Sequence, residues 1–193
     1  MAKKQTATVV EIPAMDIQEM VIGIEGDSPL VSHKWSDKAK EMMLGKQMGK
    51  AEKGKREPKD PEQDFKDSLY VDEDGDYAFP AVAFKSAAVD ACSQIDGMTK
   101  VQARGAFHVV GEFVKIEGKP NMREDMVRVG MGTADIHYRG EFKRWKCKLV
   151  VRYNARSLSR ERIINLFNIA GFAVGVGEWR PQKNGSWGMF HVA

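Results

Sequence analysis

The residue types best suited to binding chemistry gather in one stretch, GVGEWRPQKNGSWGMF, from Gly175 to Phe190. Glycines let a ligand backbone approach and leave main-chain N–H groups for anionic oxygens, while cations supply charge and tryptophans stack on bases. The stretch therefore predicts a polyanion-binding loop. The alternative is a glycine hairpin whose tryptophans fill the core. A dinucleotide site is disfavoured, because its glycines must lie between a strand and a following helix, whereas these follow a predicted helix. The loop candidates are Gly175, Gly177, Trp179, Arg180, Lys183, Gly185 and Trp187.

A predicted strand supplies a second group of candidate contacts. In WKCKLVVRY, residues 145–153, alternation places the cations on one side and the apolar residues on the other. Such a side can follow the phosphates of a nucleic acid, and its alternative is the solvated face of an antiparallel sheet. Four further residues are candidates on similar grounds, with ordinary surface positions as the alternative. The candidates outside the glycine-rich stretch are Lys34, Trp35, Lys38, Lys85, Lys146, Lys148 and Arg152.

Patterns for catalysis or metal binding are sparse. His33 and Asp37 are weak catalytic candidates, because an acid at this place can help to activate a ribose hydroxyl, although such residues on a polar turn are usually solvated. The other histidines lack paired metal-ligand spacing, and Cys92 and Cys147 lie far apart. No Walker, Gly-x-Ser-x-Gly or His-Glu-x-x-His motif occurs. We therefore expect no metal, no cofactor, and a binding protein more than an enzyme.

The elements that must position these residues alternate between strands and helices. Apolar alternation and helical spacing give the order strand, helix, strand, strand, helix, strand. This order predicts an α+β, ferredoxin-like (RRM-like) fold, in which two helices cover an antiparallel sheet. The predicted strands cover 17–25, 107–116, 145–153 and 186–192, and the predicted helices cover 35–50, 80–97 and 160–170, the last closed by Gly171.

The remaining segments predict inserted material within a single domain of residues 1–193. Glycines and prolines from Gly45 to Pro61 predict a polar, flexible loop, and Asp74-Gly75 predicts a short hairpin turn. Residues 34–76 are therefore expected to be an insertion that holds a Lys-rich helix, this loop and an acidic hairpin. Residues 120–139 are weakly patterned.

Three stretches together resemble the RAMP superfamily, the RNA-binding proteins that form the backbone of CRISPR effector complexes. The resemblance extends nearly end to end, and also fits a remote relative encoded by a bacteriophage. It implies a ferredoxin-like fold and RNA binding. The matching residues are Ser28, Pro29 and Leu30 after the first strand; Phe79, Pro80, Phe84 and Lys85 at the first core helix; and Gly175, Gly177, Arg180, Gly185, Gly188 and Phe190 near the last strand.

Charge along the chain is uneven, although the net charge is only +3. Residues 38–59 hold eight cations against three acids, and residues 139–162 hold nine cations against two acids. Between them, residues 60–76 hold eight acids against one lysine. Opposite blocks of this kind predict contacts between copies, in which the acidic block of one meets a basic block of the next.

These observations predict a binder of single-stranded RNA or single-stranded DNA that assembles head to tail into a homo-oligomer or filament. No apolar run approaches the roughly 20 residues of a membrane helix, and MAKKQTATVV lacks a secretory signal, so we expect a cytoplasmic protein, in the host cytoplasm if virus-encoded. Two alternatives remain open: an RNA-cleaving RAMP-type endoribonuclease that uses Asp37 or His33, and a scaffold protein without a nucleic-acid role.

Overall fold

An antiparallel main sheet forms the centre of the molecule. The computed structural model describes residues 12–49, 58–129 and 132–193. The main sheet has the strand order β10-β1-β9-β6-β4-β3, and β5 also pairs with β9. Its strands are β1 (Ile17–Gly26), β3 (Tyr70–Val71), β4 (Tyr77–Pro80), β5 (Phe107–Val109), β6 (Phe113–Glu117), β9 (Lys146–Asn154) and β10 (Phe190–Val192).

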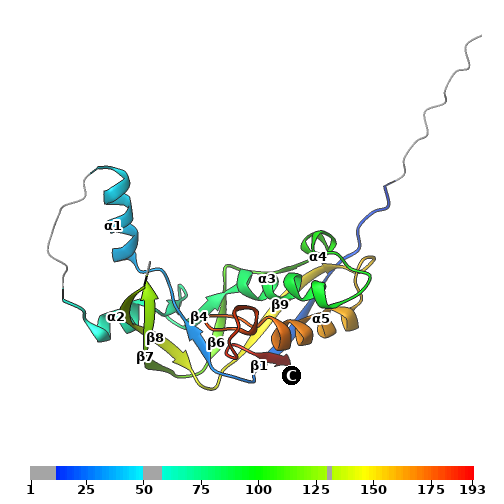
Figure 1. Cartoon of the computed structure of the whole chain (residues 1–193). Coiled ribbons are helices and arrows are strands. Elements are labelled where there is room, and N and C mark those ends of the chain that lie inside the picture. Colours follow the sequence, from blue (N-terminus) through cyan, green and yellow to red (C-terminus); the bar gives the residue numbers. More distant parts are fainter. Residues whose placement is uncertain (1–11, 50–57, 130–131) are drawn as a thin grey trace, which may run out of the picture.

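Helices cover one face of this sheet and leave the other open (Figure 1). In chain order, β1, α3, β6, β9, α5 and β10 give the predicted strand and helix pattern, and the order β10-β1-β9-β6 is that of a ferredoxin-like sheet. The predicted α+β, ferredoxin-like fold is therefore confirmed. The covering helices are α3 (Ala81–Ala91), α4 (Lys100–Ala106) and α5 (Arg160–Ala173), with the short 3-10 helices η1 (Cys92–Gln94) and η2 (Pro181–Lys183) at their ends.

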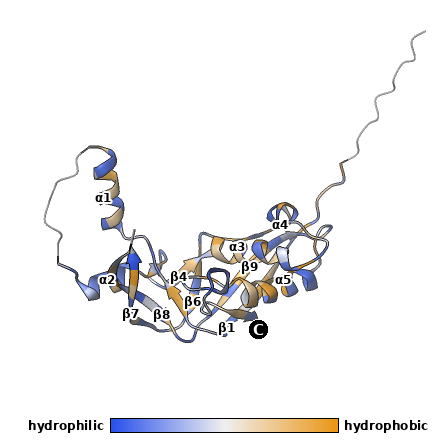
Figure 2. Ribbon diagram, viewed as in Figure 1, coloured by the Kyte–Doolittle hydropathy of each residue, from blue (hydrophilic) through white to orange (hydrophobic). Residues whose placement is uncertain are grey.

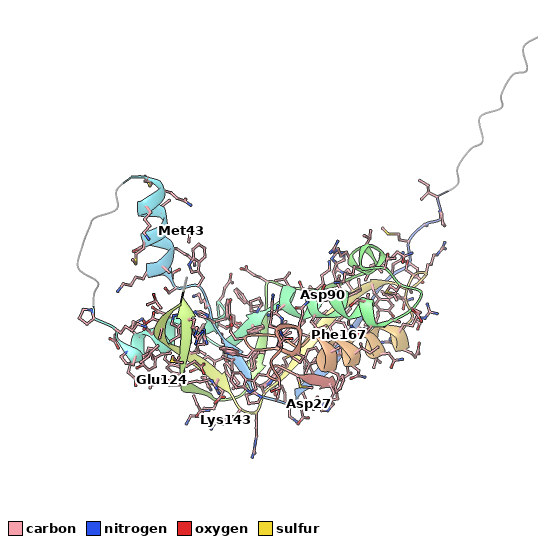
Figure 3. All side chains as sticks on the ribbon, viewed as in Figure 1. Asp27, Met43, Asp90, Glu124, Lys143 and Phe167 are labelled. Carbon is pink, nitrogen blue, oxygen red and sulfur yellow. The ribbon has the colours of Figure 1, made fainter. Side chains whose placement is uncertain are left out.

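A second sheet and two further helices lie beyond the Gly26 end of β1. The small sheet has the order β2-β8-β7, and β7 and β8 form one long hairpin. Helix α1 projects from the body and buries none of its side chains, as Met43 illustrates (Figure 3). The elements of this part are β2 (Leu30–Ser32), α1 (Asp37–Gln47), α2 (Pro61–Asp67), β7 (Pro120–Val129) and β8 (Thr133–Phe142).

Apolar side chains of the main sheet and of α3 and α5 form the core, and hydrophobic residues concentrate on these elements (Figure 2). At its centre the ring of Phe84 lies 5.8 Å from that of Phe190 and 6.4 Å from that of Trp145. The Trp145 indole N–H donates to the Ser28 carbonyl at 2.9 Å, which satisfies the only polar atom of its side chain. This bond ties the Ser28-Pro29-Leu30 turn to the core.

Several local predictions need correction. Gly171 lies inside α5 and does not close it. Glycine is required there because a Cβ at this position would collide with the Phe190 carbonyl and prevent the close packing of α5 on β10. Pro61 belongs to no loop: it begins α2, and Asp60 caps that helix. The strand predicted over 107–116 is broken into β5 and β6, and the last strand begins at Phe190. Gly45, where the loop was predicted to begin, lies within α1, and residues 50–57 of the predicted loop lie outside the described residues.

In the part of the chain that the structure describes, no helix has both the length and the apolar character needed to cross a membrane.

Candidate nucleic-acid interface

The glycine-rich loop joins the three stretches that carry the RAMP resemblance. Its Gly188 N–H donates to the Pro29 carbonyl at 2.8 Å, and its Glu178 N–H donates to the Val31 carbonyl at 3.1 Å. On its other side, a cavity of about 250 Å³ separates the loop from α3. We call it the Gly177 cavity. Its lining includes Ser86 and Asp90 of α3 together with Gly175, Gly177 and Arg180.

Main-chain amides of this loop are largely used within the protein, which corrects the expectation that they remain for anionic oxygens. The N–H groups of Gly175 and Gly185 donate to the carbonyls of Ala170 and Arg180, at 2.8 and 3.1 Å. A side chain at Gly185 would collide with the backbone of Trp179. These glycines therefore allow backbone segments to pack against one another, and do not form an amide nest for phosphate.

The two tryptophans of the loop have different environments. Trp187 is partly buried under the Arg123 guanidinium, whose carbon lies 3.9 Å from the ring centre. Trp179 packs edge-on against Trp187 at 6.0 Å but leaves 41% of its surface exposed, and its backbone has a positive φ of 56°. Trp187 thus matches the alternative of a structural plug, whereas Trp179 is available for stacking.

A second cavity, which we call the His33 cavity, lies between the base of α1, α2 and β8. It has a volume of about 280 Å³ and is lined by His33, Lys34 and Trp35, with His137 and Tyr138 facing them from β8. The Trp35 side chain is 52% exposed. The other residues of its lining are Ser36, Ala39, Lys59, Asp64, Asp67, Ser68, Asp135 and Ile136.

His33 is paired with residues distant in sequence rather than with Asp37. Its Nδ1 lies 3.7 Å from the Glu178 carboxylate, and its ring meets that of His137 edge-on at 5.7 Å. Asp37 instead lies at the start of α1, where the Lys40 ammonium 2.7 Å away lowers the pKa of its carboxyl group. Spacing along the chain therefore missed Glu178 and His137, because no local pattern connects them to His33.

Electrostatics around the histidine pair depend on burial and on neighbouring cations. Burial lowers the pKa of His137 below 6.5, and the charges of Arg139 and His33 act in the same direction. The contact with His33 is the main reason that the pKa of Glu178 is lowered, with Arg139 adding to the effect. At neutral pH, His137 is therefore neutral and Glu178 is ionised.

A charged network on the β7–β8 hairpin supports the loop tryptophans. Arg123 forms ion pairs with Asp125 at 2.9 Å and Glu141 at 2.7 Å, and the buried Arg139 lies 3.4 Å from Asp125. The Arg139 guanidinium carbon is 6.0 Å from the Trp179 ring centre. Arginines placed in this way orient the loop. The sequence did not predict this role, because the hairpin sequence is weakly patterned.

The cations predicted on the strand WKCKLVVRY lie on the open face of the main sheet, away from both cavities. Lys146 pairs with Glu25 at 2.9 Å, and Arg152 pairs with Glu19 at 3.2 Å. Lys148 lies opposite Gly23 in the ladder. The predicted wet face is therefore confirmed as exposed, but its charge is largely balanced by the glutamates of β1.

Of the remaining candidates, Lys38 and Lys183 are next to residues that line the cavities, whereas Lys85 belongs to neither lining. Lys85, on α3, contacts the His108 ring at 2.9 Å, and Lys38 is exposed on α1. Lys183 is exposed in η2, next to the Gly177 cavity. Gly177 and Arg180 line the Gly177 cavity, and Glu178 between them contacts His33 in the wall of the His33 cavity, so this short stretch of the loop connects the two cavities. We call this region the two-cavity surface; it presents Lys34, Trp35, Trp179, Arg180 and Lys183.

Metal ligation finds no support in the described chain, where no group of three or more His, Cys, Asp or Glu side chains is arranged to hold an ion.

The fold resembles that of solved Cmr proteins. No known family profile and no curated protein sequence matches the chain. A chain in the cryo-EM structure of the Type III-B Cmr-beta complex bound to cognate target RNA superposes with a TM-score of 0.51 at 10% identity, over 92% of this chain and 59% of that one. The chain therefore shares the fold of that chain of the complex. Cmr6 from Pyrococcus furiosus, at 10% identity, matches with a TM-score of 0.47 over 93% of this chain and 100% of its own.

The fold places the three stretches side by side: the glycine-rich loop is hydrogen-bonded to the Ser28-Pro29-Leu30 turn and shares a cavity with α3. Some of the residues that carry the resemblance therefore hold these stretches together.

Proposed function

We propose that this protein binds single-stranded nucleic acid, with RNA as the preferred ligand, across the two-cavity surface. The observation that carries this proposal is that each cavity has a cation in its lining and an exposed tryptophan in or beside it. Lys34 and Trp35 line the His33 cavity, and Arg180 of the Gly177 cavity follows Trp179 in the chain. Aromatic rings stack on bases of any sequence, and cations neutralise the phosphates between them. Such a surface binds with little sequence preference.

The ligand class is supported by the fold. The Cmr-beta complex that contains a chain of the same fold is bound to target RNA. RNA recognition by small α+β domains uses single strands, whose bases are free to stack on side chains. The cations of the open face, Lys146, Lys148 and Arg152, are a separate candidate contact, which ion pairs with β1 make the weaker one.

We further propose that copies assemble head to tail along the strand as a single-domain protein, with residues 34–76 as its insertion. The acidic block of residues 60–76 lies at the α2 end of the molecule, and much of the basic block of residues 139–162 lies on β9 and at the start of α5 (Figure 1). Opposite charges at separate places favour a heterologous contact, which repeats without closing.

Binding is tested by fluorescence anisotropy of a labelled oligouridylate over a series of salt concentrations. We expect log K to fall linearly with log salt, because cations displace condensed counterions from the phosphates. Lys34→Gln combined with Arg180→Gln should weaken binding and flatten the salt slope, whereas Lys119→Gln, outside the surface, serves as a matched control. An affinity that does not respond to salt contradicts the proposal.

Assembly is tested by particle images of the purified protein with and without a long single strand. Filaments or strings that form only with the strand support head-to-tail assembly on a ligand. Large particles free of nucleic acid, judged by the ratio of absorbances, instead support the scaffold alternative.

RNA cleavage is a second candidate function, favoured by the His33–His137 pair in the His33 cavity. Neutral His137 would accept the proton of a ribose 2′-hydroxyl as its oxygen attacks the adjacent phosphorus. The bond from phosphorus to the 5′-oxygen breaks, His33 donates a proton to that oxygen, and a 2′,3′-cyclic phosphate remains. The lowered pKa of His137 suits the role of base.

Labelled RNA, with a 2′-deoxy copy as the control substrate, separates cleavage from binding. If the protein is a nuclease of this kind, His33→Ala and His137→Ala each abolish the cyclic phosphate product, and Asp37→Ala leaves it. Intact RNA after long incubation with the unaltered protein excludes this second function.

A further inference from the structure

Strand β7 is an open edge of the small sheet. It pairs with β8 over ten residues, from Pro120 to Val129, and no described strand lies on its other side. Within the described residues, none of its backbone groups takes part in a backbone hydrogen bond outside the ladder with β8. An edge of this length presents a row of free N–H and C=O groups, which other strands can pair with.

An exposed apolar patch lies beside this edge. Met126 is 71% exposed and sits directly opposite Ile136 in the ladder, on the side of the hairpin that also bears Met122. Both neighbours are exposed as well. Glu124 lies on the same side, and Figure 3 shows it at the surface of the hairpin. The exposed charges of Glu124 and Arg128 protect the edge in part, but the interior of β7 carries no proline that would block pairing.

The sequence outside the described residues contains a segment suited to this edge. Residues 6–12, TATVVEI, place four β-branched residues on one side of an extended chain: Thr6, Thr8, Val10 and Ile12. The intervening residues are Ala7, Val9 and Glu11, so five of the seven residues are β-branched, a composition with high β-propensity. Ile12 itself is described, and it is exposed.

Chain length prevents this segment from reaching β7 of its own molecule. Ile12 lies five residues before Ile17, a span of at most about 18 Å. The nearest end of β7, at Pro120, pairs through Phe142 with Leu30, just beyond the far end of β1. The ten residues of β1 alone extend roughly 30 Å, and Figure 1 shows residues 12–16 and the β7–β8 hairpin at opposite ends. Pairing of the whole segment with β7 must therefore join two copies.

We infer that residues 6–12 of one copy add as a strand to the β7 edge of the next copy. Ladder hydrogen bonds supply the attachment, and the β-branched side covers Met122, Met126 and Ile136. Residues 12–16, which follow the donor segment, and the β7 edge lie at opposite ends of each molecule, so the contact repeats head to tail. This inference rests on the proposed head-to-tail assembly and names the elements that form it.

A peptide of residues 4–14 tests the acceptor edge without nucleic acid. The peptide is labelled and titrated with the full chain carrying Thr8→Pro and Val9→Pro, so that its own segment cannot compete. Adjacent prolines are used because one of two successive N–H groups must point to the partner strand. We expect saturable binding that Met126→Lys weakens by about tenfold or more, while Val82→Lys, a change at a 65% exposed position on α3, leaves it unaltered.

Particle mass in the presence of a long single strand tests the donor segment. The Thr8→Pro, Val9→Pro chain should keep its affinity for the oligonucleotide in dilute solution but place fewer copies on the long strand than the unaltered chain. Absence of peptide binding, or unchanged particle mass, overturns the inference. The inference is also overturned if Met126→Lys abolishes assembly while Thr8→Pro and Val9→Pro do not, because two β7 edges then pair with each other. Loss of oligonucleotide binding by the unaltered chain contradicts the proposed function instead.

Discussion

Replacement of Trp179 by glycine is the sharpest test of the two-cavity surface. The ring is 41% exposed and packs on Trp187 with its remaining area, so one base at most can stack on it. Base–aromatic stacking is worth about 1–3 kcal/mol per base, and partial access favours the lower half of this range. We expect binding of a labelled oligouridylate to weaken by about 1–2 kcal/mol, or roughly 5- to 30-fold in Kd.

Glycine is chosen because the Trp179 backbone has a φ of 56°. A non-glycine residue in this left-handed region costs about 1–2 kcal/mol, so its removal offsets part of the packing lost with the ring. Trp179→Phe keeps an aromatic face and should retain most of the affinity. Phe172→Ala, at an exposed position on α5 away from both cavities, controls for the loss of apolar surface.

Anisotropy titrations at one fixed salt concentration measure the four Kd values, and circular dichroism confirms that each variant is folded. If Trp179→Gly binds within twofold of the unaltered chain while folded, the stacking argument is refuted, and with it the assignment of the ligand to this surface.

Three further predictions address the site and the fold. Lys34→Gln should reduce the slope of log K against log salt by about 0.7, whereas Lys148→Gln, on the open sheet face, should leave it unchanged; the reverse result in the same titrations would move the ligand to that face. Gly171→Ala should lower the melting temperature by several degrees, since overpacking costs about 1–3 kcal/mol and α5 cannot approach β10 past a methyl group. Gly105→Ala in α4, where a Cβ meets nothing within 4 Å, should not lower the melting temperature. Equal melting curves for the two variants would contradict the packing argument. Burial lowers the pKa of His137 below its ordinary 6.5, so the unfolded chain takes up this proton at a higher pH than the folded chain does. The contribution of His137 to stability is therefore full above pH 6.5 and declines as pH falls through the lowered pKa. Urea unfolding at several pH values should show a smaller decline for His137→Gln, and an identical decline would refute this.

The sequence by itself determined the framework of the fold. β1, α3, β9 and α5 follow from local periodicity and from caps such as Ser159, whose hydroxyl accepts from the Arg162 N–H. Such signals depend on neighbours within a few residues, and they predict elements whose apolar side meets one core. The exposed candidates Trp35 and Trp179 were also predicted from residue type alone.

The sequence did not predict the β7–β8 hairpin, because one of its sides is charged. One side of this hairpin carries charges of both signs, Arg123 and Asp125 on β7 facing Arg139 and Glu141 on β8, so no apolar alternation marks it. These charges are tolerated because they pair with one another and lie against the loop tryptophans. A pattern based on hydrophobicity has no means of finding a strand whose inner side is ionic.

Only the tertiary structure decided which candidates share a surface. It paired Lys146 and Arg152 with glutamates of β1, more than a hundred residues away, and brought His33 to Glu178 and His137 rather than to Asp37. It also directed the amides of the glycine-rich loop inward. Charge and hydrogen-bonding capacity belong to the residue type, but whether they remain for a ligand depends on which strands become neighbours, and that is settled only when the chain folds.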